Sequence, residues 1–211
     1  MSRDDIIATV AQLGFQNFSV PALARTLGVD HSTLYRYIDG RDDLVVAAME
    51  RCFAQNAWPP AENGDWSETV RAYGRAYSRL YAEHPGLAWA LGNISRRVNA
   101  SVETMNLFRT ALVDRGVAPY EALLLSDMLA QLVRGVYGLW HDDTNSGVTL
   151  VERNAALLSR FERTASGADP RVVEALWDFT SEDVEAQLEK RVEILIAGFR
   201  PLVEATGTRP L

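Results

Sequence analysis

The sequence contains few of the residues that covalent cross-linking, metal binding and catalysis most often use. Its 211 residues include one cysteine, Cys52, so a disulfide within the chain is excluded. The three histidines stand far apart, and no HExxH, GxSxG or GxxxxGK(S/T) motif occurs. We therefore expect no metal site, no cofactor and no enzymatic activity.

Long apolar runs and excess positive charge are also lacking. No run approaches the length that a membrane-spanning helix needs, and the N-terminus lacks a basic-then-apolar signal peptide. Together with the scarcity of cysteine, this predicts a cytoplasmic protein with no membrane partner. The formal net charge is −7. Composition alone therefore does not indicate a nucleic-acid-binding protein.

Apolar residues recur at three- and four-residue spacing along most of the chain, which predicts helices. No strand-like alternation of useful length occurs, so we expect an all-α fold. The predicted helices span about 3–13, 41–55, 66–83, 96–115, 119–141 and 181–204, with a short helix opening at Pro85 and further helix between 147 and 165.

Residues 18–38 carry the most specific pattern in the chain. Ser19 is placed to cap one helix, Gly28 to end it in the left-handed region, and Asp30 to cap the next. The inward positions of the two helices are apolar: Leu23, Ala24, Leu27, Leu34 and Ile38. Two helices joined by such a tight corner form a helix-turn-helix, whose second helix lies in the DNA major groove.

The outward face of the second helix consists almost entirely of hydrogen-bonding side chains. They are His31, Ser32, Thr33, Tyr35, Arg36 and Tyr37. Hydroxyl and guanidinium groups reach base edges and phosphates, and rings pack on thymine methyl groups. An ordinary surface hairpin is the alternative interpretation, and it does not account for the small and apolar residues at the spacings that the motif needs.

A linker is predicted at 58–66, where two prolines and a glycine interrupt the helical pattern. It divides the chain into an N-terminal three-helix helix-turn-helix head, residues 1–56, and a larger C-terminal helical bundle, residues 57–211. The head is not basic: residues 1–56 hold five arginines and seven acidic residues, a net charge of −2. We therefore expect weak binding to random duplex.

The run LGVDHSTLYRYIDGRDDLVVAAME resembles the DNA-binding head of tetracycline-repressor-type (TetR family) regulators. The segment DWSETVRAYGRAYSRLYAEHPGL is similar more loosely, and the ending DVEAQLEKRVEILIAGFRPLV resembles the last helix of the tetracycline-responsive branch. The resemblance implies that Thr33 and Tyr35 touch an operator and that Arg41 grips phosphate. Pro21 stands where the tetracycline repressors carry a base-reading arginine, which implies a different operator. With Ser19 at a helix N-terminus, the expected DNA-binding residues are Ser19, His31, Ser32, Thr33, Tyr35, Arg36, Tyr37 and Arg41.

Two helices of the bundle look suited to self-association. The last one carries an apolar stripe: Val184, Leu188, Val192, Leu195, Phe199 and Leu202. The helix at 119–141 is apolar nearly all round, and Gly135 and Gly138 would permit close approach of a partner. The resemblance implies that these helices pair with their copies, so we expect a homodimer. The alternative is that both stripes pack inside one monomer.

The bundle is also rich in aromatic residues, and small-molecule sites are mostly apolar with a few polar groups. By analogy with the family, residues on the middle helices would line a pocket for an apolar or aromatic effector. The candidates are Trp89, Asn93, Met105, Phe108, Tyr137 and Trp140. The sequence thus predicts a ligand-responsive regulator, a repressor that binds a palindromic operator and is released by a small molecule. A repressor without a ligand, and an enzyme with an accessory helical head, are the alternatives.

Overall fold

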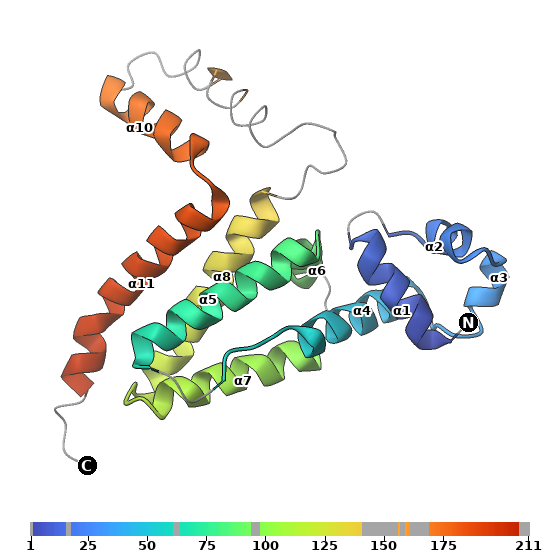
Figure 1. The fold of residues 1–211 in the computed structure, drawn as a ribbon, viewed down its shortest axis with the longest axis horizontal. Coiled ribbons are helices and arrows are strands. Elements are labelled where there is room, and N and C mark those ends of the chain that lie inside the picture. Colours follow the sequence, from blue (N-terminus) through green and yellow to red (C-terminus); the bar gives the residue numbers. More distant parts are fainter. Residues whose placement is uncertain are drawn as a thin grey trace.

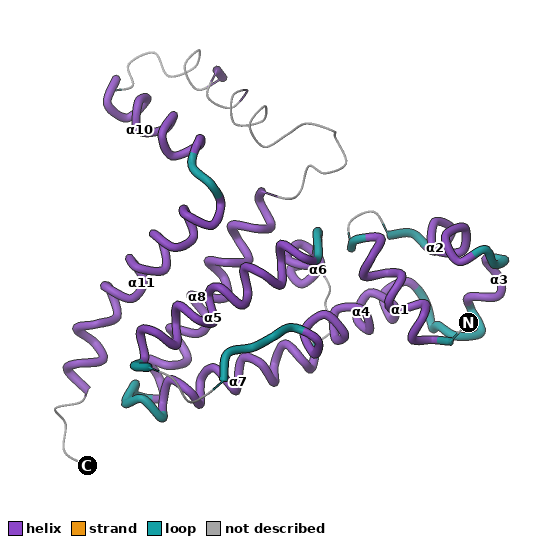
Figure 2. The backbone as a smooth tube through the Cα atoms, in the orientation of Figure 1, coloured by secondary structure: helices purple, strands orange, loops and turns teal. Residues whose placement is uncertain are grey.

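The computed structural model describes residues 2–15, 18–60, 64–93, 98–140, 156, 159–160 and 169–206, and within them every regular element is a helix (Figure 1; Figure 2). The predicted all-α class is confirmed. The helices are α1 Arg3–Leu13, α2 Val20–Leu27, α3 His31–Leu34, α4 Arg41–Gln55, α5 Trp66–Glu83, α6 Leu87–Asn93, α7 Asn99–Val113, α8 Pro119–Trp140, α10 Pro170–Ser181 and α11 Val184–Thr206.

Most predicted bounds lie within a few residues of the observed ones, and the largest differences outside the helix-turn-helix fall in the C-terminal half. The last helix begins at Val184 rather than near 181, because Glu182 is extended and separates it from α10. Helix α10 was not predicted as a separate element. Of the further helix expected between 147 and 165, the structure describes residues 156, 159 and 160, which are helical.

Helices α1 to α4 enclose a small apolar core. Helix α1 packs against α2 and α4, and α2 packs against α3. The side chains at the centre have no exposed surface: Ile6, Val10, Phe15, Leu23, Leu34 and Leu44. An ion pair of 3.1 Å between Arg3 and Asp43 joins the start of α1 to the start of α4. Four short helices are thereby held as one unit.

Helix α8 lies at the centre of the remaining helices and contacts α5, α6, α7 and α11. Its inward residues Leu125, Leu129 and Val133 are completely buried. Helix α4 runs from the N-terminal helices to the bundle and packs against α7 (Figure 1). Helix α10 buries none of its residues. No helix in the described part of the chain is both long and apolar enough to cross a membrane.

The apolar stripe of α11 does not form a free surface. Leu188, Val192, Leu195 and Phe199 are buried within the chain, where α11 packs on α5 and α8. Only Leu202 of this stripe is clearly exposed. The alternative that the stripe packs inside one monomer is therefore correct for most of it.

Cys52 is packed against the same core that α4 shares with the bundle. Burial raises the pKa of its thiol to about 12. The reactive species of a cysteine is the thiolate, so this side chain fills space and is not activated.

Candidate DNA-binding head and ligand cavity

The corner between α2 and α3 is built as the sequence predicts. The Ser19 hydroxyl accepts a hydrogen bond of 3.2 Å from the N–H of Ala22 and caps α2. Gly28 ends the helix at φ +65°, a conformation that L side chains rarely adopt. The N–H of Val29 then donates to the carbonyl of Ala24 at 3.0 Å. These bonds fix the direction in which the next helix leaves.

The second helix of the motif is shorter than predicted. Helix α3 ends at Leu34, and 3₁₀-like bonds continue it, from the N–H of Arg36 to Thr33 and from that of Tyr37 to Leu34. The Asp30 side chain makes no capping hydrogen bond, which corrects the expectation for it. Its carbonyl accepts the N–H of Thr33 at 2.9 Å instead.

The predicted recognition residues lie together on the outer side of this helical turn. Leu34 beneath them is completely buried, which fixes which side faces outward. Tyr35 is 52% exposed, and its ring meets the imidazole of His31 edge to face, with 5.1 Å between ring centroids. Thr33 is half-buried, and the others are exposed: His31, Ser32, Tyr35, Arg36 and Tyr37. Donors, acceptors and rings are therefore presented side by side.

Arg41 opens α4 beside this face. Its guanidinium lies over the Phe18 ring at 5.8 Å from the centroid and 3.5 Å from the Asp42 carboxylate. Asp43, the other acid of this first turn, is paired with Arg3. The Arg3 pair therefore offsets one of the negative charges near the surface where a phosphate would approach.

The predicted ligand residues whose side chains the structure describes have different surroundings. Phe108 is completely buried and stacks on Tyr73, with 4.3 Å between the ring centroids. Tyr137 is buried, and its hydroxyl is 2.6 Å from that of Ser78. Trp89 is partly exposed on α6, where the amide of Asn93 donates to its carbonyl.

Of the predicted ligand residues with described side chains, only Met105 lines the cavity between α4, α5, α6, α7 and α8. Trp140 ends α8, and its side chain lies outside the described residues.

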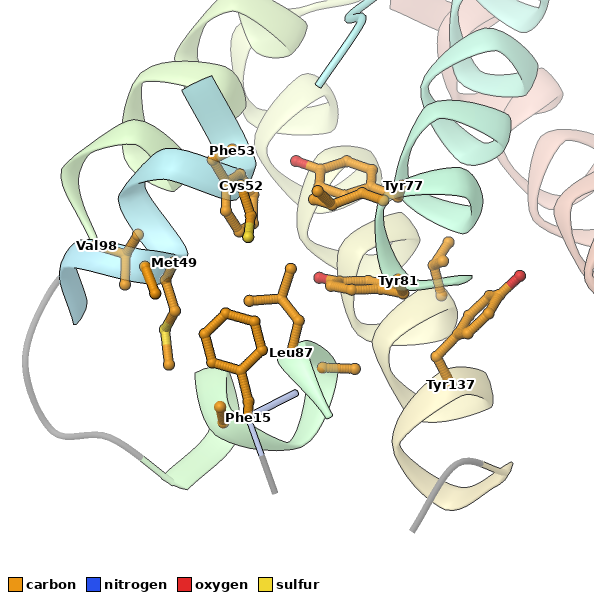
Figure 3. Close-up of a cluster of buried hydrophobic side chains, with 14 of the residues drawn as sticks. Phe15, Met49, Cys52, Phe53, Tyr77, Tyr81, Leu87, Val98 and Tyr137 are labelled. Carbon is orange, nitrogen blue, oxygen red and sulfur yellow. The ribbon is translucent and has the colours of Figure 1, made fainter. Parts of the chain in front are cut away.

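A cavity of about 260 Å³ lies between α4, α5, α6, α7 and α8. Its wall is mostly apolar with two tyrosines, a serine and an arginine. The lining residues are Phe53, Tyr77, Tyr81, Leu91, Val98, Ser101, Val102, Met105, Ala130 and Arg134. Figure 3 shows the hydroxyls of Tyr77 and Tyr81 pointing to the side of α5 where Phe53 and Cys52 of α4 lie.

Among the residues that line this cavity, only Met105 was predicted from the sequence. One pattern in the sequence does indicate two of the others. Tyr73, Tyr77 and Tyr81 follow one another at four-residue spacing, which places them on one face of α5. Ring contacts continue this row from the linker to α8, through Phe53, Trp58, Tyr73, Tyr77, Tyr81 and Tyr137. The row of tyrosines on α5 therefore predicts the lining of this cavity better than aromatic residues chosen singly.

Glu50 of α4 binds the first turn of α7. Its carboxylate accepts hydrogen bonds from the backbone N–H groups of Asn99 and, at 2.7 Å, of Ala100. The N-cap residue Val98 offers no side-chain oxygen, so a residue 49 positions away in sequence caps the helix. Val98 also lines the cavity. The start of α7 therefore both binds α4 through Glu50 and forms part of the cavity wall.

A second groove, of about 610 Å³, lies between α5 and α11. Its two walls carry opposite charges, with Arg71, Arg75 and Arg79 on α5 and Glu185, Glu189 and Glu193 on α11. No residue of α4 lines it. The cavity that reaches Phe53 is therefore the better candidate for a site that acts on the N-terminal helices.

A tight glycine corner, a buried leucine and an outward row of polar side chains define α2 and α3 as a helix-turn-helix. Residues 7–48 match the model of a family described as bacterial regulatory proteins, tetR family. The match spans the helix-turn-helix and most of α1 and α4 on either side of it, so this region is similar to that family.

Curated relatives carry names that agree with this assignment. An HTH-type transcriptional repressor from Mycobacterium tuberculosis is 29% identical over 183 residues, which cover 82% of this chain and 64% of the relative. The chain thus spans less than two thirds of the length of that relative. An HTH-type transcriptional regulator from Saccharopolyspora erythraea is 21% identical over 208 residues, covering 94% of this chain and 84% of the relative.

Solved structures share the fold over nearly the whole chain. A possible TetR family transcriptional regulator from Streptomyces coelicolor A3(2) superposes with a TM-score of 0.80 at 22% identity, covering 95% of this chain and 100% of that one. ActR from Streptomyces coelicolor, in complex with actinorhodin, gives 0.72 at 22% identity and 94% coverage of each chain. The bundle that follows the head therefore has the architecture of TetR family proteins.

Proposed function

We propose that this protein is a ligand-responsive transcriptional repressor of the cytoplasm that binds a palindromic operator as a homodimer. Residues 1–56 form its DNA-binding domain, and residues 57–211 form its ligand-binding and dimerisation domain. The family match in the head, and relatives named as transcriptional regulators and repressors, support a regulator and not an enzyme.

The polar side chains of residues 31–37, which surround buried Leu34, support the DNA-binding part of the proposal. Thr33, Tyr35 and Arg36 read base edges in the major groove, and Ser32 and Tyr37 flank them. Ser19 and Arg41 stand at the first turns of α2 and α4, where backbone N–H groups and a guanidinium meet phosphates. The acidic balance of the head makes the specific contacts more important, because non-specific attraction to DNA is weak.

A second copy of the chain covers the outer faces of α8 and α11 in this proposal. Large apolar side chains are exposed there: Leu123, Leu124, Met128, Ile194 and Leu202. A Cβ added at Gly135, Gly138 or Gly198 would meet nothing within 4 Å of the same chain, which leaves room for close approach of another helix. A twofold dimer sets two recognition helices about 34–36 Å apart along DNA.

The effector occupies the cavity between α4 and α8 and acts through α4. Phe53 of α4 and Val98 of α7 both line this cavity, and Glu50 bonds α4 to the start of α7. A ligand that favours one relative position of α4 and α7 shifts the head to which α4 belongs. Thorough switching requires a preference of about 10⁴-fold between the two states. The similar structure of ActR was solved in complex with actinorhodin, which supports a small-molecule effector in this architecture.

The test is selection of bound duplexes from random DNA by the purified protein, followed by gel-shift titration of the selected site. We expect a palindromic site and a loss of affinity of roughly tenfold to hundredfold for Tyr35→Ala, since a base contact contributes about 1–3 kcal/mol. Leu107→Ala is the control, because Leu107 is a large exposed side chain on α7, outside the head and the two proposed interface helices.

Three results would contradict the proposal or a part of it. Absence of any preferred duplex at low ionic strength removes the DNA-binding function. Equal losses for Tyr35→Ala and Leu107→Ala show that α3 is not the recognition element. A selected site whose binding no metabolite alters identifies a repressor without a small-molecule ligand and overturns the effector part.

A further inference from the structure

The Tyr77 hydroxyl is the unsatisfied group of the α4–α8 cavity. Tyr77 is 2% exposed, and its hydroxyl has no hydrogen-bond partner among the described residues. A buried polar group without a partner is unfavourable, because it has lost its hydrogen bonds to water. The neighbouring Tyr137 hydroxyl, in contrast, is paired with Ser78. Tyr77 therefore carries an unpaired hydroxyl in the wall of a cavity that is mostly lined by apolar side chains.

The two tyrosines of the cavity act as hydrogen-bond donors at neutral pH. Burial raises the pKa of Tyr77 and of Tyr81 above the ordinary value for tyrosine. Both therefore keep their protons, and each O–H can be donated to a ligand oxygen. Figure 3 shows the two hydroxyls on the same side of α5. The cavity thus offers two donors along one wall.

The charge of the lining is positive. Arg134 of α8 contributes its guanidinium, and the lining that the described residues provide contains no carboxylate. No ion pair joins Arg134 to a described acidic residue. Its charge is close enough to Tyr81 to favour the ionised form of that phenol, which opposes the effect of burial. A negative charge on a ligand would be stabilised beside Tyr81 and Arg134.

The volume of the cavity matches a small ligand. A cavity of roughly 150 Å³ holds benzene, and sites for drug-sized molecules occupy about 300–1,000 Å³. The 260 Å³ found here fits one ring with short substituents. Phe53, Val102 and Met105 supply apolar and aromatic surface for such a ring.

From these four observations we propose that the cavity binds a one-ring aromatic acid. Its carboxylate lies beside Arg134 and Tyr81, and a second oxygen across the ring accepts a hydrogen bond from Tyr77. This inference rests on the proposed function only in taking the cavity as the effector site. Binding to the purified protein is measured without DNA, so its failure is separate from failure of operator recognition.

The experiment is calorimetric titration of the full chain with 4-hydroxybenzoate, benzoate and 4-hydroxybenzamide. We expect 4-hydroxybenzoate to bind about tenfold or more tightly than either analogue, since one lacks the oxygen for Tyr77 and the other lacks the charge. Tyr77→Phe removes the preference for 4-hydroxybenzoate over benzoate. Arg134→Gln removes the preference for the acid over the amide.

Arg75→Gln is the control, because Arg75 is an exposed arginine on α5 that does not line this cavity. It should leave all three affinities unchanged. Equal affinity for the acid and the amide, or binding of none of the three probes, overturns the proposal. Loss of binding in Tyr77→Phe for benzoate and 4-hydroxybenzoate alike also overturns it, because the hydroxyl contacts only the second oxygen.

Discussion

The guanidinium of Arg71 grips the carboxylate of Glu193 with two hydrogen bonds, of 2.6 and 2.9 Å, and thereby ties α5 to α11. Arg71 also contacts Glu68 at 2.6 Å. Further along the same groove, Arg75 and Glu189 carry opposite charges from the two walls without forming an ion pair. The bidentate pair of Arg71 and Glu193 therefore links α5 and α11 at one end of the groove between them.

Exchange of this pair is expected to show coupling between its members. Arg71→Glu and Glu193→Arg should each destabilise the fold, and the double exchange should recover about 0.5–1 kcal/mol, the range for exposed pairs with good geometry. The measurement is urea unfolding at one fixed protein concentration. Arg75→Glu with Glu189→Arg is the control cycle, in which no recovery relative to the native charges is expected. Equal coupling in both cycles would mean that the observed contact contributes nothing specific.

The carboxylate of Glu50 is expected to stabilise the start of α7. Glu50→Ala leaves the N–H groups of Asn99 and Ala100 without their acceptor, which should cost about 1 kcal/mol, as loss of a cap does. Because the same bond joins α4 to the cavity wall, the change in operator affinity on adding effector should also shrink. Thermal unfolding and gel-shift titration measure the two effects.

Glu103→Ala is the matched control for Glu50, since Glu103 is an exposed glutamate within α7. It should alter neither stability nor coupling. If Glu50→Ala lowers stability but leaves the effector response intact, α4 transmits the signal by another contact.

Gly28→Ala is expected to lower the stability of the fold through backbone strain and not through a steric clash. The added Cβ meets nothing within 4 Å, but φ is +65°, so the variant should be destabilised by about 1–2 kcal/mol. Gly92→Ala, at a helical glycine with equal space and no positive φ, should be neutral or slightly stabilising. Thermal unfolding compares the two, and equal effects would show that the corner does not depend on the left-handed conformation.

Local signals in the sequence predicted the elements that depend on local chemistry. Ser19, Gly28 and buried Leu34 gave the corner and its outward face correctly, because capping and left-handed turns involve residues close in sequence. The α11 stripe was assigned to the wrong partner, since periodicity shows that Leu195 is covered but not by which helix. The cap by Glu50 could not be predicted, because it acts over 49 residues.

The lining of the cavity could not be predicted either, because it is formed by residues that are far apart in the sequence. Tyr77 and Tyr81 come from α5, Met105 from α7 and Arg134 from α8, and only the folded bundle brings these side chains to one wall. The sequence predicted that aromatic residues of the middle helices line a site. It did not separate Tyr77, which faces the cavity, from Phe108, which packs on Tyr73.

The outer face of α11 is expected to determine the oligomeric state. Ile194 is 72% exposed although large and apolar, and it lies on the same helix as Gly198, where the chain leaves space for a partner. Ile194→Glu would place an unpaired charge in the proposed interface, which is strongly unfavourable once desolvated. The variant should be monomeric by light scattering at micromolar concentration, under conditions in which the unmodified protein is a dimer. Leu107→Glu is the matched control, because Leu107 is 61% exposed on α7, which is not one of the two proposed interface helices. A dimer that survives Ile194→Glu, or that is lost equally in Leu107→Glu, would place the interface on another surface.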